Sequence, residues 1–373
     1  MQLLSILILA TWVLAFGRTL LNLRLVPRLA SRALQRQPLV SIIVPARDEE
    51  RSIERAVRGF LLQTYPQLEV IVVNDRSVDR TGAILASIAD PRLVVVTGEE
   101  PPAGWLGKPW ALHQGSLRAR GEILLFVDAD VIYHPEAVAS AVARFENREV
   151  AMLALLPHLE VHGFWESVVM PNLAVFAFTF LPMWLTNRTR IALIAVGGGP
   201  GNLVRREAYD AAGGHASLKD AVVDDVALAR LIRRKGMRTE VARANHLVSV
   251  RMYHGLGEIV RGFTKNAFAV FGRSYLVAAF FFAMAVVFHL LPYPLALTGD
   301  RYAIVTVLLI SLTRVILFRV IGYSVVNALF AHPLMIGTWC YILARSIWFT
   351  GIRRQLEWRG RKYDARKTRF GAD

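Results

Sequence analysis

Long apolar stretches without charged side chains restrict the possible folds of this 373-residue chain more than any other feature. A helix needs about 20 predominantly apolar residues to cross a bilayer. The uncharged runs that approach or exceed this length are 3–17, 167–187, 275–298 and 320–344. With a mean hydropathy of +0.39, the chain is too apolar for an ordinary soluble enzyme, and we predict an integral membrane protein.

The basic residues lie beside these runs. The chain has 44 Lys and Arg against 29 Asp and Glu, a net charge of +15. Residues 1–47 contain no acid, and a second basic cluster occupies 351–373. This pattern is typical of the cytoplasmic side of a membrane protein, and no basic motif interleaved with aromatic residues indicates a nucleic-acid partner. We therefore predict a multi-pass protein of the inner (cytoplasmic) membrane, with an anchor at 1–24, a transmembrane region at 274–350 and a cytoplasmic basic tail at 351–373.

The segment 38–250 has a different pattern. Short runs rich in β-branched residues, at 40–44, 68–73, 92–96 and 122–127, alternate with helical periodicity at 49–62, 79–89, 108–119 and 135–145. Alternating strands and helices predict a mainly parallel sheet with helices on both faces. We therefore expect an α/β, Rossmann-like domain in addition to the transmembrane helices.

Acidic residues follow the predicted strands. Asp48 comes after the first strand, Asp75 after the second, and Asp128-Ala-Asp130 after the fourth. Open α/β sheets bind ligands at the carboxyl ends of their strands, so these carboxylates should lie at one binding edge. Asp128 and Asp130 could hold Mg²⁺ or Mn²⁺, which prefer oxygen ligands and phosphates. The alternative is a solvated turn whose acids cap the next helix.

Four segments resemble, in order and spacing, the signatures of family 2 glycosyltransferases with the GT-A fold. They are Val44-Pro-Ala-Arg-Asp-Glu-Glu50, Val73-Asn-Asp-Arg-Ser-Val-Asp79, Asp128-Ala-Asp130 and Val223-Asp-Asp225. Two further segments resemble the membrane-bound branch associated with hopanoid biosynthesis and the related carotenoid-acid glycosyltransferases: Gly104-Trp-Leu-Gly-Lys-Pro-Trp110 and Trp358-Arg-Gly-Arg-Lys-Tyr363. The chain departs from the usual pattern at Asp48, where Asn is commoner, at Asn74, which replaces Asp, and at Asp224, which replaces Glu.

This resemblance implies a nucleotide-sugar donor and a divalent metal. Asp48 and Asp75 would accept hydrogen bonds from the base or ribose, and Lys108 would meet the diphosphate. A metal ion would stabilise the leaving diphosphate. A surface lysine at a helix start is the alternative for Lys108. The expected donor-binding residues are Pro45, Asp48, Asp75, Lys108 and Asp128, and the expected ligands of Mg²⁺ or Mn²⁺ are Asp128 and Asp130.

The resemblance places the catalytic base at Asp225, next to Asp224. In an inverting transfer, one carboxylate takes the proton of the acceptor hydroxyl while that oxygen attacks the anomeric carbon opposite the diphosphate. Capping of the helix that starts here is the alternative. The glycine-rich loop at 197–202 allows the backbone to approach a substrate closely. The residues expected on the acceptor side are Asn202, Arg251 and His254.

One active site limits the membrane topology. If 167–187 crossed the bilayer, Asp225 and Asp130 would lie on opposite sides. We therefore predict that 164–187 is interfacial or re-entrant, broken at Pro171 and Pro182, and that 251–273 is an amphipathic interface segment. Of the later runs, 275–298 and 320–344 are predicted to cross. The run 302–318 contains Arg314, so two or three C-terminal spans are possible, and two return the basic tail to the cytoplasm.

The predicted function is inverting, non-processive transfer of one sugar. The motif Gln-x-x-Arg-Trp of processive synthases is absent, because no glutamine occurs between Gln114 and Gln355. The expected donor is UDP-linked, and the expected acceptor is a membrane lipid, a terpenoid such as a hopanoid or a carotenoid acid. A polyprenyl-phosphate glycosyltransferase and a polysaccharide-type synthase are the alternative enzymes. A transporter and a non-catalytic nucleotide-binding scaffold are the alternatives from other classes.

Overall fold

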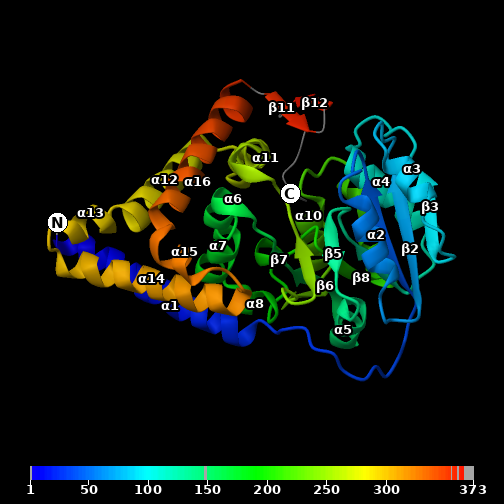
Figure 1. The fold of residues 1–373 in the computed structure, drawn as a ribbon, viewed down its shortest axis with the longest axis horizontal. Coiled ribbons are helices and arrows are strands. Elements are labelled where there is room, and N and C mark those ends of the chain that lie inside the picture. Colours follow the sequence, from blue (N-terminus) through cyan, green and yellow to red (C-terminus); the bar gives the residue numbers. More distant parts are fainter. Residues whose placement is uncertain (1, 147–148, 354, 359–360, 365–373) are drawn as a thin grey trace. The chain divides into compact units, whose positions relative to one another are not determined.

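The computed structural model describes residues 2–146, 149–353, 355–358 and 361–364 (Figure 1). The chain forms two compact units. The α/β unit comprises Val26–Glu160 and Trp184–Met252, and the helical unit comprises the first helix, Val161–Met183 and the described residues from Tyr253 to Asp364. Part of the predicted basic tail, at 354, 359–360 and 365–373, lies outside the described residues.

The α/β unit contains a seven-stranded sheet in the order β3-β2-β1-β4-β8-β6-β9. Neighbouring strands from β3 to β4 are parallel, as are β6 and β9, whereas β8 runs antiparallel to both of its neighbours. The expected α/β fold with a mainly parallel sheet is therefore confirmed. The strands of this sheet are β1 (Val40–Ala46), β2 (Leu68–Asn74), β3 (Leu93–Thr97), β4 (Ile123–Phe126), β6 (Val150–Leu156), β8 (Asn202–Arg205) and β9 (Arg238–Arg243).

Helices cover this sheet because its central strands are apolar on both faces. All four residues of β4 are buried, as are the first six of β2, which is typical of parallel strands between helical layers. The helix α4 packs on β1 and β2. The helices of this unit are α2 (Ile53–Leu61), α3 (Thr81–Ala86), α4 (Gly107–Arg118), α5 (Ala137–Phe145), α9 (Arg206–Ala212) and α10 (Asp224–Arg234), and a small second sheet contains β5 (Val131–Tyr133), β7 (His158–Leu159) and β10 (Val248–Val250).

A buried carboxylate, that of Glu69 on β2, joins three segments of the sheet. Its Oε1 accepts hydrogen bonds from the Ser41 hydroxyl of β1 at 2.6 Å and from the backbone N–H of Arg120 at 2.7 Å. The Arg120 Nε–H donates to Oε2 at 2.9 Å. Burial raises the pKa of Glu69, but the hydrogen bonds from Ser41 and Arg120 outweigh burial and lower the pKa below its ordinary value.

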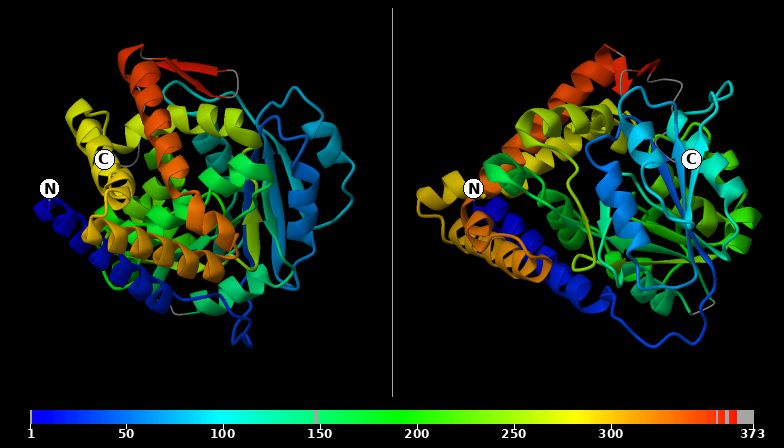
Figure 2. Two further views of the ribbon diagram at one scale, coloured as in Figure 1. Left: turned by 60° about the vertical axis from the view of Figure 1, so that its left-hand side comes forward. Right: turned by 45° about the vertical axis from the view of Figure 1, so that its right-hand side comes forward.

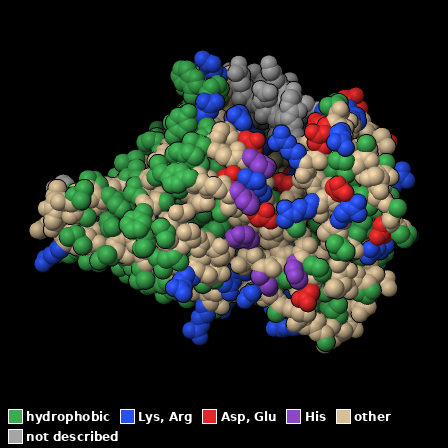
Figure 3. All heavy atoms as spheres, in the orientation of Figure 1, with side chains coloured by type: hydrophobic (Ala, Val, Ile, Leu, Met, Phe, Trp, Pro, Cys, Tyr) green, Lys and Arg blue, Asp and Glu red, His purple; other side chains and the backbone are tan. Residues whose placement is uncertain are grey.

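The helical unit exposes many apolar side chains. Leu3, Leu14, Leu276 and Leu308 are all more than half exposed, and the surface of its helices is largely hydrophobic in Figure 3. The helix α14 runs alongside α1 (Figure 2). The elements here are α1 (Gln2–Leu25), α6 (Gly163–Val169), α7 (Asn172–Phe180), α11 (Gly255–Val270), α12 (Tyr275–Ala285), α13 (Pro292–Leu297), α14 (Arg301–Ile321), α15 (Val325–Phe330), α16 (His332–Ser346) and the hairpin strands β11 (Gln355–Trp358) and β12 (Arg361–Asp364), while α8 (Met183–Thr186) lies at the boundary of the units.

Four helices of the described residues are long and apolar enough to cross a membrane: Gln2–Leu25, Gly163–Phe180, Tyr275–Leu297 and Arg301–Ile321. Exposed apolar helices of this length indicate membrane association. They agree with the predicted anchor and with the span that starts at Tyr275.

The apolar run 320–344, which we predicted to cross the membrane, is not one continuous helix. The helix α14 ends at Ile321, and Gly322 follows it in the left-handed conformation with φ +88°. A glycine there ends a helix at little steric cost. The later residues form α15 and α16, which are separated at Ala331 because Pro333 starts a new helix. By contrast, Arg301–Ile321 is one continuous helix that buries Arg314.

The segment 164–187 is interrupted at the two predicted places. The helices α6 and α7 are separated at Met170 and Pro171, and α7 ends before Pro182. Proline lacks the amide hydrogen that a continuing helix needs. Within α7, Phe176 is 48% exposed, whereas Phe178 is 4% exposed. Phe178 is therefore part of the packing of the helical unit, and Phe176 is available to contact lipid.

The substitution Glu69→Gln should lower the free energy of unfolding by about 1–3 kcal/mol at pH 7, because a neutral amide cannot accept all three hydrogen bonds. The folded-state pKa of Glu69 is lowered, so its stabilisation is present above the unfolded value near 4.5 and is lost as the pH falls below it. The difference between variant and wild type should therefore shrink below about pH 4.5. Unfolding of the detergent-solubilised chain, followed by tryptophan fluorescence, measures this.

The exposed Glu54, which pairs with Arg58 on α2, provides the matched control. Glu54→Gln should change the stability by less than about 0.5 kcal/mol. A difference for Glu69→Gln that stays constant down to pH 3 would contradict the prediction.

Candidate active site

The ends of β1 and β2 hold two of the predicted carboxylates close together. Pro45 lies within β1, Asp48 is the second residue after β1, and Asp75 directly follows β2. The guanidinium of Arg47 lies 3.4 Å from Asp75 Oδ2 and 3.9 Å from Asp48 Oδ2. The Val78 N–H donates to Asp48 Oδ1 at 2.8 Å. Parallel pairing of these strands thus creates a polar edge of the kind that binds nucleotides.

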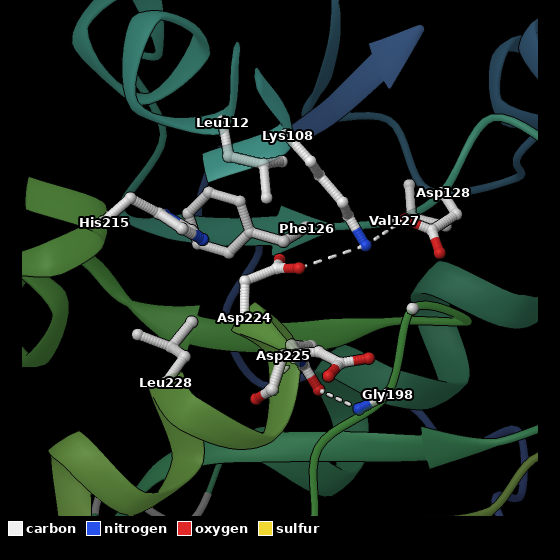
Figure 4. Close-up of a pocket in the computed structure, with 12 residues that line it drawn as sticks. Lys108, Leu112, Phe126, Val127, Asp128, Gly198, His215, Asp224, Asp225 and Leu228 are labelled. Atoms are coloured by element: carbon white, nitrogen blue, oxygen red, sulfur yellow. Dashed lines mark hydrogen bonds and ion pairs between the residues drawn. The ribbon is translucent and has the colours of Figure 1, made fainter. Parts of the chain in front are cut away.

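A small pocket of about 10 Å³ lies at the end of β4, with room for one water-sized group (Figure 4). Asp128, which follows β4, and Asp224 and Asp225, which start α10, bring three carboxylates to it. The pocket is lined by Lys108, Leu112, Phe126, Val127, Asp128, Gly198, Gly199, Asn202, His215, Asp224, Asp225 and Leu228.

Lys108 connects the carboxylates of this pocket. Its Nζ lies 2.7 Å from Asp128 Oδ1 and 3.4 Å from Asp224 Oδ1 (Figure 4). Lys108 is the second residue of α4, so the start of this helix carries the ammonium group to the end of the sheet. The Lys108 side chain is 22% exposed and is ion-paired within the pocket. Burial opposes the charged ammonium, but the carboxylates of Asp128, Asp224 and Asp225 outweigh burial and raise the pKa of Lys108 well above its ordinary value.

The glycine-rich loop before β8 packs directly against these acids. The Asp128 N–H donates to the Gly199 carbonyl at 2.9 Å. A β-carbon at Gly199 would collide with the Asp128 carboxylate, and one at Gly197 would collide with the Asp225 backbone. Asn202 holds the loop, since its Oδ1 accepts from the Gly198 N–H at 3.2 Å. We expected the backbone of this loop to approach a substrate closely. In the structure it lies against Asp128 and Asp225.

The acids at the start of α10 have raised pKa values. Burial raises the pKa of Asp224 to about 7, because repulsion from Asp225 and Asp128 adds to burial and Lys108 offsets them only in part. Burial also raises the pKa of Asp225. The Asp225 Oδ1 accepts from the backbone N–H of Val226 at 2.7 Å, so this residue also makes a local bond at the helix start.

The local charge balance suits a divalent cation. Around Lys108 the pocket carries the three carboxylates of Asp128, Asp224 and Asp225. Burial, with repulsion from Asp128 and Glu49, raises the pKa of Asp130 to about 7. In the described part of the chain, no three His, Cys, Asp or Glu side chains are grouped as a metal cage. Mg²⁺ typically uses one or two carboxylates together with phosphate oxygens and water, so the donor set fits a metal that binds with a diphosphate.

The predicted site residues are only partly brought together. Lys108, Asp128, Asn202, Asp224 and Asp225 all line the pocket, whereas Asp130 and Arg251 do not. His254 belongs to the helical unit, where it precedes α11 and its Nδ1 lies 3.4 Å from Glu258.

Sequence reasoning missed His215 and Arg47. His215 lines the pocket although it lies far from every predicted motif, and only its position after Gly213 and Gly214, which bend the chain at positive φ, could have drawn attention to it. Arg47 lies inside the first motif, beside Asp48, and its charge next to two predicted carboxylates was an available signal.

Residues 41–212 match the model of glycosyl transferase family 2. A 4,4'-diaponeurosporenoate glycosyltransferase from Staphylococcus aureus (strain MRSA252) is 26% identical over 376 residues, which cover 96% of this chain and 97% of that protein. Among solved structures, a mannosyltransferase from Pyrobaculum calidifontis in complex with GDP-Man and Mn²⁺ shares 20% identity, with a TM-score of 0.52, and covers 92% of this chain and 96% of that one. Residues 41–212 therefore match glycosyl transferase family 2, and the α/β unit has the GT-A fold.

Proposed function

We propose that this enzyme transfers a single sugar, with inversion, from a nucleoside diphosphate sugar to a membrane lipid. The observation that carries the proposal is the shared pocket of Lys108, Asp128, Asp224 and Asp225. It combines a cation for a diphosphate, carboxylates for a metal and a carboxylate for proton removal. These are the three chemical requirements of an inverting transfer from such a donor.

The nucleoside of the donor binds at the polar edge formed by Asp48 and Asp75, next to Pro45. Ionised carboxylates accept hydrogen bonds from the imide of uracil and from the ribose hydroxyls. Asp75 is 5% exposed and is held by Arg47 at 3.4 Å. A fixed carboxylate is pre-organised for this bond, so less entropy is lost when the donor binds.

The diphosphate binds between Lys108 and a metal held by Asp128 and Asp130. Mg²⁺ or Mn²⁺ at this place supplies charge stabilisation of the leaving diphosphate. The Lys108 Nζ is paired with Asp128 Oδ1 at 2.7 Å. The ammonium therefore neutralises the acids until a donor with its cation arrives, and it then turns to the phosphate oxygens.

Asp225 acts as the base that takes the acceptor proton. Asp224 is held by Lys108 at 3.4 Å, whereas Asp225 Oδ1 accepts from the backbone N–H of Val226 and keeps lone pairs for a proton. Burial raises the pKa of Asp225, and a base is most effective when its pKa approaches the working pH. Asp224 orients Lys108, and Asn202 fixes the loop that faces the acceptor.

The acceptor is a terpenoid acid or alcohol dissolved in the bilayer. The exposed apolar helices of this chain and the carotenoid acid named for the relative of similar length support this choice. Arg251 and His254 are proposed to contribute on the acceptor side. Transfer to a polyprenyl phosphate is the alternative, and it would use the same donor chemistry.

The proposed topology keeps the catalytic domain, 38–250, on the cytoplasmic side. The anchor crosses once, and Tyr275–Leu297 and Arg301–Ile321 form a crossing pair that returns the chain to the cytoplasm. Both helices of this pair are long and apolar enough to cross. The segments 164–187 and 251–273 lie at the membrane interface.

Asp225→Asn should lower the transfer rate by about 10²- to 10⁴-fold, because the amide cannot take the proton. Donor affinity should change by less than about threefold, since the carboxylate acts on the acceptor. Product formation is followed by mass spectrometry of the lipid, and donor binding by calorimetry. Asp210→Asn, at an exposed position on α9, is the control and should be fully active. Wild-type turnover by Asp225→Asn would rule out this base.

Removal of divalent metal with a chelator should abolish transfer, and added Mn²⁺ or Mg²⁺ should restore it. Asp128→Asn and Asp130→Asn should each weaken Mn²⁺ binding in the presence of UDP by about tenfold or more, because a metal ligand is lost. Electron paramagnetic resonance of free Mn²⁺ measures this without relying on turnover. Transfer that resists the chelator would contradict the metal role.

A green fluorescent protein fused after Asp373 should fluoresce in a bacterial host, and alkaline phosphatase fused there should be inactive, because the two proposed crossings return the chain to the cytoplasm. The opposite pattern would require an odd number of crossings after Lys265.

A further inference from the structure

His215 is a buried histidine in the wall of the active-site pocket. It is 1% exposed and lies in the short helical turn Gly214–Leu218. Its ring lies edge-on to Phe126, with centroids 4.7 Å apart. In the view of Figure 4, His215 and Asp128 are at opposite ends of the pocket, with Asp224 between them.

The hydrogen bonds of Ser116 and Tyr209 indicate the tautomer of the His215 ring. The Ser116 hydroxyl donates to the His113 carbonyl at 2.8 Å, and the Tyr209 hydroxyl donates to Ser116 Oγ at 3.2 Å. The single hydroxyl hydrogen of Tyr209 is then used, so its oxygen accepts from the His215 backbone N–H at 3.0 Å and from His215 Nδ1 at 2.8 Å. We therefore assign the proton of the neutral ring to Nδ1, which leaves Nε2 as a hydrogen-bond acceptor.

No hydrogen bond within the described residues uses Nε2 of His215. Nε2 belongs to a ring that lines a pocket of about 10 Å³, so a group in the pocket can bond to it. That volume accommodates one water-sized group. A group that bonds to Nε2 must donate a hydrogen bond, because Nε2 is an acceptor.

The proposed position of the donor identifies this group. If the diphosphate lies at Asp128 and Lys108, the anomeric carbon lies beside it, and the far side of the sugar ring points toward the opposite end of the pocket. That end carries His215. A sugar hydroxyl is a donor of the size of one water molecule.

We propose that Nε2 of His215 accepts a hydrogen bond from a hydroxyl group of the transferred sugar and thereby selects among sugar donors. Tyr209 is a positioning residue, because it holds the proton on Nδ1 and turns the lone pair of Nε2 toward the pocket. This proposal rests on the proposed function, since it requires a nucleotide-sugar donor in this pocket.

Donor binding to the full chain in detergent with Mn²⁺ tests the proposal by calorimetry. The wild type is first offered UDP-glucose, UDP-galactose, UDP-N-acetylglucosamine and GDP-mannose, and the monodeoxy analogues of the tightest donor are then compared with the parent. One analogue should bind about three- to tenfold more weakly than the parent. In His215→Phe, the parent should weaken by a similar factor, and that analogue should lose no further affinity, because the two changes remove the same bond.

Three controls distinguish the loss of a hydrogen bond between His215 and the sugar from a general effect of the substitution on the structure. His215→Phe should keep wild-type affinity for UDP or GDP, which lack the sugar, and His215→Gln, whose Oε1 is an acceptor, should regain part of the discrimination. His246→Phe, at a histidine that bonds to Arg28 outside the pocket, should leave every affinity unchanged. If His215→Phe does not fold, His215→Gln and Tyr209→Phe carry the comparison, and both should reduce the penalty of the same analogue.

Equal penalties for every analogue in wild type and variants would overturn the role of His215. A parallel loss of nucleotide affinity in the variants would also overturn it. If the wild type binds no nucleotide-sugar more tightly than the free nucleotide, the proposed function fails and this inference fails with it. If the wild type discriminates among the analogues and the variants discriminate equally well, only the role of His215 is refuted, and the proposed function stands.

Discussion

The ammonium of Lys108 between Asp128 and Asp224 is the interaction on which the pocket depends. Its Nζ lies 2.7 Å and 3.4 Å from the two carboxylates, which come from the end of a strand and the start of a helix far apart in the sequence. Without this cation, the clustered carboxylates of Asp128, Asp224 and Asp225 would repel one another. The sheet edge, the start of α4 and the start of α10 therefore have to meet at one point.

The same arrangement explains the glycine-rich loop and the network behind it. Gly197 and Gly199 lie so close to the acids that a side chain would displace them, and Asn202 fixes the loop through its amide oxygen. On the other side, Tyr209 and Ser116 hold the ring of His215. The pocket is thus closed by backbone on one face and by a hydrogen-bonded aromatic pair on the other, which makes it rigid before any substrate binds.

The excess of negative charge in this small pocket raises the affinity of its acids for protons and cations. Burial and mutual repulsion raise the pKa of Asp224 and of Asp225, so the folded protein holds groups that are ready to bind a proton or a cation. In the proposed transfer, a metal with its diphosphate would relieve the repulsion near Asp128, and a carboxylate whose basicity burial has increased would take the acceptor proton.

The sequence by itself determined the α/β fold, because β-branched runs and helical periodicity directly reflect which residues are buried. It also placed Asp48, Asp75 and Asp128 at strand ends, where parallel pairing brings them to one edge. It did not determine where apolar helices end: hydropathy describes 320–344 as one run, but Gly322 and Pro333 divide it through backbone geometry. It also could not separate Asp128 from Asp130, or identify His215. Which atom faces a pocket depends on the packing of segments distant in sequence, and only the tertiary structure decided that.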